Sequence, residues 1–100
     1  KKEDNIIIKE IYKNIIDFKN LKYLNFRDIC YDLFIYDIDL LETIFIIFNK
    51  LVDDGYLNKD NISGLFYDIH VFLKYYNNNY RPIYHLEKYF FSIIKTIHNL

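Results

Sequence analysis

The sequence predicts an all-α protein, a compact bundle of about five helices. Apolar residues recur at intervals of three and four residues in five segments, the spacing that gives a helix one buried face. No stretch of useful length alternates between apolar and polar residues as a half-buried strand would. The chain has only 2 Gly and 1 Pro, too few for the turns of an all-β sandwich. Its 100 residues correspond to a single domain, 1–100.

The first two helices are predicted at 5–18 and 26–35. Asp4 or Asn5 can cap the first helix and Asn25 the second, because these side chains accept hydrogen bonds from the free N–H groups of a first turn. The apolar stripe of the first helix consists of Ile7, Ile8, Ile11, Ile15 and Phe18. The stripe of the second consists of Phe26, Ile29, Cys30 and Leu33.

The third predicted helix, 40–52, has the clearest ends. Asp39 and Glu42 have the spacing of a capping box at its start. Gly55 follows its last apolar residue and can adopt the left-handed conformation that commonly ends a helix. Its inner face is predicted to be broad and to contain Leu40, Leu41, Ile44, Phe45, Phe48, Leu51 and Val52.

The last two helices are predicted at 59–77, capped by Asn58, and at 82–99, where Pro82 suits the first helical position. Gly64 is about 1 kcal/mol less favourable than Ala inside a helix, so we expect another segment to approach closely there. The two inner stripes are Ile62, Leu65, Phe66, Ile69, Leu73 and Tyr76, and Ile83, Leu86, Phe90, Ile93, Ile94 and Ile97. All connections are short, which favours antiparallel packing of consecutive helices.

The apolar content predicts a protein partner. Apolar residues make up 52% of the chain, more than the core of so small a domain can bury, and large exposed apolar surfaces usually mark an interface. Both of the last two helices carry a second apolar face beside the inner stripe. The predicted subunit-interface residues are Tyr67, Val71 and Tyr75 on the fourth helix, and Tyr84, Phe91 and His98 on the fifth.

Charge and composition argue against several classes of function. The net charge of −1 offers no basic field for nucleic acid, and a single Cys excludes an internal disulfide. Two glycines cannot supply a Gly-rich phosphate loop, so ATP binding within the chain is not expected. No apolar run reaches the ~18–20 residues of a membrane-spanning helix, and no signal peptide is present.

The residues that could carry chemistry form no specific motif. An acidic cluster consists of Asp28, Asp32, Asp37 and Asp39, for which we expect caps and solvated positions, with a basic partner surface as the alternative. His70, His85 and His98 are far apart in the sequence, and Cys30 falls on a predicted buried face. We therefore predict no catalytic, cofactor-binding or metal-ligating residue and no enzymatic activity in this chain.

The end of the chain is more specific. Tyr75-Tyr76, a polar stretch and then Ile83-Tyr84-His85-Leu86-Glu87 open an aromatic-rich helix, and Tyr31-Asp32-Leu33 lies upstream. Over most of residues 6–94, these features resemble the C-terminal collar domain of a small subunit of eukaryotic replication factor C. In that family the upstream triplet is Tyr-Glu-Leu, and the polar loop is longer and contains a glycine.

This resemblance implies an assembly role. Replication factor C is a nuclear, ATP-driven complex of five subunits that loads the sliding clamp onto primer–template DNA in replication and repair. Each subunit has an AAA+ module followed by a helical domain, and the five helical domains form a closed collar. The chain would be one collar domain, with its AAA+ module upstream. The implied partners are the other subunits and, indirectly, the clamp and DNA; ATP and magnesium would belong to the parent complex.

Two alternatives from other classes stay open. A stand-alone helical module could bind nucleic acid through Tyr75, Tyr76 and Tyr80 with Lys74 and Arg81, although the near-neutral charge disfavours it. A helical regulator could instead offer an apolar groove to a peptide helix.

Overall fold

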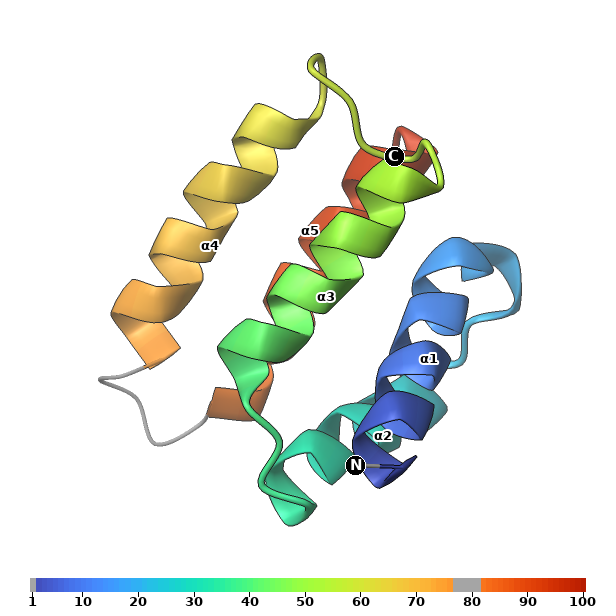
Figure 1. Ribbon diagram of the computed structural model, residues 1–100, viewed down its shortest axis with the longest axis vertical. Helices are drawn as coiled ribbons and strands as arrows, with labels where there is room; N and C mark the ends of the chain where they lie inside the picture. Colours follow the sequence, from blue (N-terminus) through green and yellow to red (C-terminus); the bar gives the residue numbers. More distant parts are fainter. Residues whose placement is uncertain (1, 77–81) are drawn as a thin grey trace.

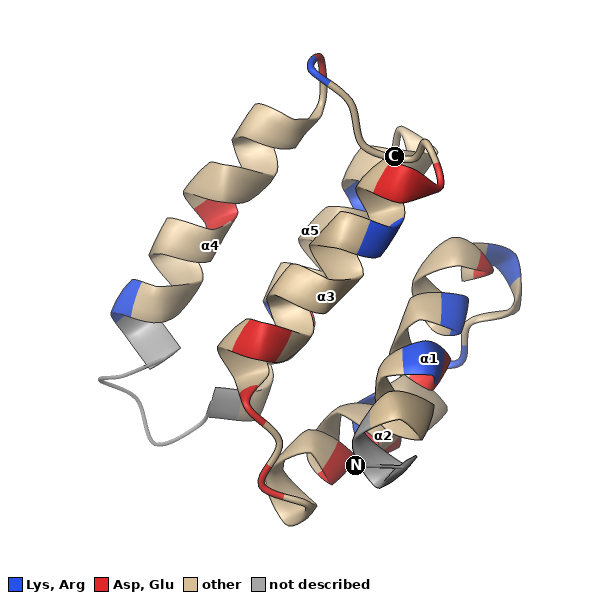
Figure 2. Ribbon diagram, viewed as in Figure 1, with Lys and Arg blue, Asp and Glu red and all other residues tan. Residues whose placement is uncertain are grey.

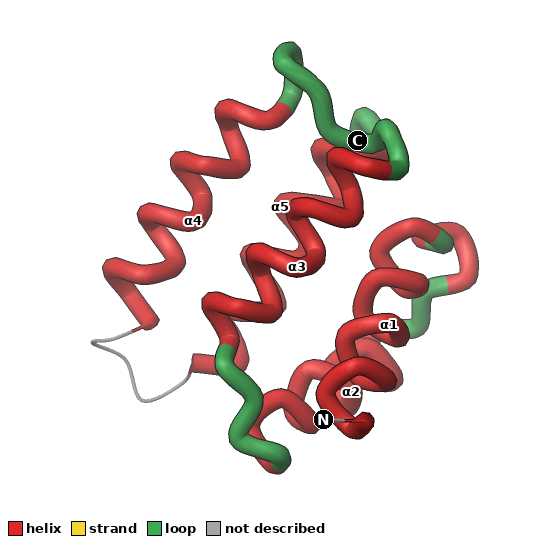
Figure 3. Tube along the Cα trace, in the orientation of Figure 1, coloured by secondary structure: helices red, strands yellow, loops and turns green. Residues whose placement is uncertain are grey.

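The computed structural model describes the backbone of residues 2–76 and 82–100 and the side chains of residues 5–74 and 83–100. The helices are α1 (Lys2–Ile16), the short 3₁₀-helix η1 (Phe18–Asn20), α2 (Tyr23–Ile35), α3 (Leu40–Asp53), α4 (Ile62–Tyr76) and α5 (Pro82–His98). The described residues contain no strand, as Figure 3 shows. The prediction of an all-α bundle of five helices is confirmed.

Helix α5 occupies the centre of the bundle. It packs against α4 and also against α1 and α2, which are far from it in the sequence. In Figure 1, α3 lies in front of α5, α4 lies on one flank, and α1 and α2 lie on the other. Consecutive helices pack together in the α1–α2 and α4–α5 pairs, as the short connections predicted.

The core gathers around the inner face of α5. Leu86, Phe90 and Ile94 are buried, as their spacing predicted. Phe90 meets Phe26 of α2 edge-on, with 6.0 Å between the ring centroids. The rest of the core comes from all the other α-helices and from two loop residues, Ile38 and Leu57. Its buried apolar residues on α1 to α4 include Ile11, Ile15, Cys30, Leu33, Ile44, Ile47, Leu51, Leu65 and Phe72.

An ion pair joins α5 to α2. Glu87 is only 8% exposed, and Nε of Arg27 lies 3.1 Å and 3.2 Å from its two carboxylate oxygens. The hydrogen bond to Glu87 and the negative charge of Glu87 raise the pKa of Arg27. A buried carboxylate is costly without a cationic partner, so this pair fixes the position of α2 on α5.

A tyrosine ties α1 to the end of α3. The Tyr12 hydroxyl donates a hydrogen bond to the Asp54 carboxylate and lies 3.3 Å from the Lys50 carbonyl oxygen. The Lys50 ammonium lies 5.2 Å from the centroid of the Tyr12 ring, within the range of a cation–π contact. Burial, and then the hydrogen bond to Asp54, raise the pKa of Tyr12, so its phenol stays protonated and able to donate at neutral pH.

The predicted ends of α3 are confirmed. The Asp39 carboxylate accepts a hydrogen bond from the Glu42 N–H at 3.0 Å. Gly55 has a φ of +86°, and the N–H groups of Gly55 and Tyr56 donate to the carbonyls of Val52 and Leu51. These two bonds form a Schellman motif, which satisfies carbonyls that the end of a helix leaves free.

The same type of ending recurs without glycine. Asp37 (φ 51°) follows α2 and Asn99 (φ 56°) follows α5, both in the left-handed region. The next residue in each case, Ile38 or Leu100, donates its N–H to a carbonyl five residues earlier. Asn and Asp tolerate this conformation better than other residues with a side chain. The acidic cluster thus supplies one helix start, at Asp39, and one helix ending, at Asp37.

Two predicted helix starts are wrong. Helix α2 begins at Tyr23 instead of 26, because the Phe26 N–H already donates to the Lys22 carbonyl and Asn25 therefore lies inside the first turn. Helix α4 begins at Ile62 instead of 59. Asn58 and Asn61 form a side-chain-stabilised turn there: the Asn58 N–H donates to Asn61, and the Asn58 side chain accepts from the Asp60 N–H.

The close approach expected at Gly64 is also wrong. Gly64 is exposed, and a Cβ atom built on it would meet nothing within 4 Å. The glycine therefore lowers the stability of α4 without a packing reason.

The two glycines provide a matched test. Gly64→Ala is expected to raise the free energy of unfolding by about 0.5–1 kcal/mol, because Ala has the higher helix propensity and space is available. Gly55→Ala is expected to lower it by ~1 kcal/mol or more, because a side chain disfavours the left-handed conformation. Urea unfolding followed by circular dichroism measures both. Equal effects of the two substitutions would contradict this assignment.

Candidate interaction surface

The predicted interface residues of α4 occupy its outer side. Tyr67 is exposed, and Val71 is partly buried beside a pocket between α4 and α5. The backbone of Tyr75 continues α4, but its side chain lies outside the described residues. Tyr67 thus stays available to a partner.

The predicted interface residues of α5 do not share one free face. Tyr84 is exposed, but Phe91 packs against α2, with its ring centroid 5.2 Å from that of Tyr23 and 5.6 Å from that of Phe26. The expectation that Phe91 lies on a surface separate from the fold needs correction, because α2 extends further toward the N-terminus than predicted and Tyr23 reaches the ring of Phe91.

His98 likewise makes contacts within the chain. Its Nε2 lies 2.9 Å from the carbonyl oxygen of Ile15, near the end of α1, and its ring lies 5.5 Å from that of Phe18. Phe18 was expected to continue the stripe of the first helix but belongs to η1 instead. His98 therefore joins α5 to the end of α1.

A larger apolar surface lies along α3 and α4. Leu41, Phe45 and Val52 follow one another at intervals of four and seven residues on α3 and are exposed, Phe45 by 49%. Phe66 of α4 is 55% exposed and stacks on Phe48 of α3, with 5.7 Å between ring centroids and 5° between planes. The stacked pair joins the two helices, and we call these residues the α3–α4 face.

A second apolar surface lies on α2. Leu24, Tyr31 and Ile35 follow one another at intervals of seven and four residues on the side opposite the buried Phe26, Cys30 and Leu33. Leu24 is 75% exposed and Ile35 is 70% exposed. We call the three exposed residues the α2 face. In Figure 1, α2 lies partly behind α1 on one side of the bundle and α4 lies on the other, so the two faces are separate.

The sequence pattern assigned the α3–α4 residues to the core. The inner stripe predicted for the third helix contained seven residues, and the structure buries four of them: Leu40, Ile44, Phe48 and Leu51. The other three form the exposed stripe. A stripe that wide exceeds the contact area of one neighbouring helix, and this width was the signal in the sequence that part of it lies at the surface.

Charges do not concentrate near either surface. Figure 2 shows residues of both signs spread over the helices and loops, with no cluster of one sign. Among the described side chains, no group of three His, Cys, Asp or Glu could hold a metal ion. None of the helices in the described ranges combines the length and hydrophobicity needed to cross a membrane.

The single thiol is enclosed by the core. Cys30 has no exposed surface, and burial, with a smaller effect of the Glu87 charge, raises its pKa. A protonated, inaccessible thiol is a poor nucleophile. This agrees with the prediction that Cys30 packs in the core.

Cys30 consequently reports on unfolding. A thiol reagent such as dithionitrobenzoate is expected to label native protein at least about 10³-fold more slowly than urea-unfolded protein, because labelling requires a global opening. Absorbance at 412 nm follows the reaction. Labelling of native protein at the rate of the unfolded chain would contradict the burial of Cys30.

The contacts of Phe91 predict an intermediate effect on stability. Phe90→Ala is expected to lower the free energy of unfolding by about 3–5 kcal/mol, as for a fully buried aromatic residue. Phe91→Ala, which removes two ring contacts from a partly buried site, is expected to lower it by ~1–3 kcal/mol. Tyr84→Ala is the exposed control, with an effect within about 0.5 kcal/mol.

Urea unfolding of the three variants measures these differences. If Phe91→Ala unfolded at the same urea concentration as Tyr84→Ala, the contacts between Phe91 and α2 would contribute nothing to the stability of the fold.

Comparison with known proteins gives no family for this fold: no family model matches the chain, and neither curated proteins nor solved structures give a match.

Proposed function

We propose that this chain is an assembly domain, one helical collar domain of a clamp loader of the replication factor C type. The observation that carries the proposal is the presence of two separate apolar faces, the α2 face and the α3–α4 face. The similarity of residues 6–94 to the collar domain gives the assembly its expected identity.

Two faces are what a closed ring requires. A subunit in a ring touches its two neighbours through different surfaces, so one surface must complement the other, or its counterpart on a related subunit. A symmetric dimer needs only one such surface. The two faces have matched dimensions, because the stripe from Leu24 to Ile35 and the stripe from Leu41 to Val52 both span eleven residues of helix, about 16 Å.

The matched length suggests how neighbours meet. The α2 face of one subunit would lie along the α3–α4 face of the next, with Leu24, Tyr31 and Ile35 against the stripe of α3. Phe45 and Phe66 are the expected anchors, because large aromatic side chains dominate the energetics of protein interfaces. Tyr67 and Tyr84, exposed outside both faces, are further contacts to test.

The finer parts of the proposal concern the parent protein. Its AAA+ module, with ATP and magnesium, would lie upstream, and the collar would hold this subunit beside the others while the complex loads the sliding clamp onto primer–template DNA in the nucleus. The chain itself would contribute binding energy to the ring and would not be an enzyme.

One observation favours a second candidate. The α3–α4 face presents apolar stripes from two adjacent helices, an arrangement that suits an amphipathic peptide helix. A stand-alone module of this kind needs only that face and leaves the α2 face without a role. For the nucleic-acid candidate, the side chains of Tyr75, Tyr76, Tyr80 and Arg81 lie outside the described residues.

The two candidates differ in their response to charge on each face. Phe45→Lys on α3 and Ile35→Lys on α2 are each expected to weaken binding to one neighbouring subunit by at least about tenfold, because a charge is then buried in an apolar interface. Ile6→Lys on α1, equally exposed but outside both faces, is the matched control and is expected to bind as the unmodified chain does.

Co-expression with the other clamp-loader subunits of the same organism, followed by pairwise affinity measurements, tests this expectation. Failure of the unmodified chain to bind any of these subunits would refute the collar proposal. Loss of binding by Phe45→Lys alone, to a helical peptide and not to a subunit, would establish the second candidate.

A further inference from the structure

A pocket of 240 Å³ lies between α4 and α5, apart from both apolar faces. Its lining comprises Asp68, Val71, Phe72, His85, Lys88, Tyr89 and Ser92. The volume is below the ~300–1,000 Å³ of ordinary small-molecule pockets, so it suits a fragment or a single side chain rather than a nucleotide.

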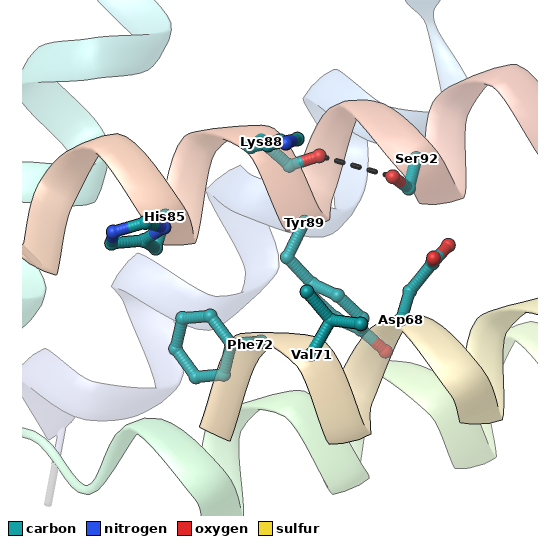
Figure 4. A pocket seen from close by; sticks show the side chains of 7 residues that line it. All are labelled: Asp68, Val71, Phe72, His85, Lys88, Tyr89 and Ser92. Carbon is teal, nitrogen blue, oxygen red and sulfur yellow. Dashed lines mark hydrogen bonds between the residues drawn. The ribbon is translucent and has the colours of Figure 1, made fainter. Parts of the chain in front are cut away.

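Tyr89 makes this pocket more than a packing defect. The residue is 2% exposed, yet its hydroxyl has no hydrogen-bond partner among the described residues. Buried hydroxyls are normally paired, because leaving one unpaired costs about 1–3 kcal/mol. Figure 4 shows the Tyr89 side chain crossing from α5 toward α4, so that its hydroxyl ends near Val71 and Asp68.

The charge beside this hydroxyl is negative. Burial, and then the charge of Asp68, raise the pKa of Tyr89, so the phenol stays protonated close to a carboxylate. The other charged side chain of the lining, Lys88, is exposed and in Figure 4 lies across α5 from the Tyr89 hydroxyl. Apolar surface completes the site, since the Phe72 and Tyr89 rings lie 5.8 Å apart.

We propose that this pocket binds a primary ammonium or a guanidinium group, held between the Asp68 carboxylate and the Tyr89 hydroxyl. Such a group carries several N–H donors, so one can bond to the carboxylate while another bonds to the oxygen of Tyr89. Its aliphatic stem would lie against Phe72 and Val71. A carboxylate ligand would be repelled by Asp68, and a neutral alcohol would leave that charge without a partner.

This cation has two sources with the same chemistry: a free small amine, or a Lys or Arg side chain of a partner protein. The proposal does not depend on the assembly role, because neither apolar face contributes to the pocket. Its failure would leave the assembly proposal intact, and the reverse also holds.

Butylammonium is the first probe, with 1-butanol and butyrate as neutral and anionic analogues of the same length. Titration of the ¹⁵N-labelled chain followed by nuclear magnetic resonance is expected to give saturable shifts at residues 68, 71, 89 and 92 with butylammonium alone, at a Kd on the order of 1–10 mM for so small a ligand. Equal binding of 1-butanol, or no saturation with butylammonium, would overturn the proposal without any variant.

Three variants assign the contacts. Asp68→Asn is expected to weaken butylammonium binding by at least about tenfold and Tyr89→Phe by roughly three- to tenfold, the cost of losing a charged and a neutral hydrogen bond. Asp60→Asn, an exposed carboxylate in the loop before α4, is the matched control and should bind within about twofold of the unmodified chain. An unchanged Kd in Asp68→Asn would overturn the proposal, and far-UV circular dichroism checks the fold of each variant.

Blocked tripeptides distinguish the two sources. Acetyl-Gly-Lys-Gly-amide or acetyl-Gly-Arg-Gly-amide binding at least tenfold more tightly than butylammonium would assign the pocket to a partner's side chain. Tighter binding of butylammonium would assign it to a free amine.

Discussion

The fold depends on the burial of α5. This helix is the last in the chain, and α1, α2 and α4 each take a different side of it. Glu87 meets Arg27 of α2, Tyr89 meets Phe72 of α4, and His98 meets the carbonyl of Ile15 at the end of α1. Between these contacts, Leu86, Phe90, Ile93 and Ile94 fill the core. The earlier helices therefore gain most of their long-range contacts only when α5 is in place, since little else joins α1 and α2 to α4.

The helix endings fix the directions in which the chain leaves each helix. Left-handed residues at Asp37, Gly55 and Asn99 turn the backbone sharply and return an N–H to the preceding turn. After α2 and α3, the turn also brings a buried apolar residue, Ile38 or Leu57, back to the core. Short connections can then join long helices without leaving buried polar groups unsatisfied.

The surplus of large apolar residues has a consistent physical interpretation. The core holds as many as five helices can enclose, and the remainder forms stripes at helical intervals on α2 and on α3 and α4 rather than a random scatter. Ordered stripes are what another helix packs against, and scattered apolar residues would need no explanation. This ordering is the physical basis of the proposed assembly role, and it is independent of the similarity to the clamp-loader collar.

The sequence by itself determined the helices and their inner faces, because a 3.6-residue period and the side chains that end helices are local properties. The ends of α3 at Asp39 and Gly55 and the burial of Cys30, Leu86 and Phe90 follow from such patterns. It also determined that apolar residues would remain exposed, since this depends only on composition and size.

Which apolar residues stay exposed was decided by the tertiary structure alone. Phe91 and Phe45 both belong to apolar faces of their helices, yet α2 covers Phe91 and no described element covers Phe45 to the same extent. The pairing of Arg27 with Glu87 and the pocket beside Tyr89 likewise join residues of different helices. Sequence spacing gives the direction of a side chain from its own helix axis, and only the packing of the helices sets what lies in that direction.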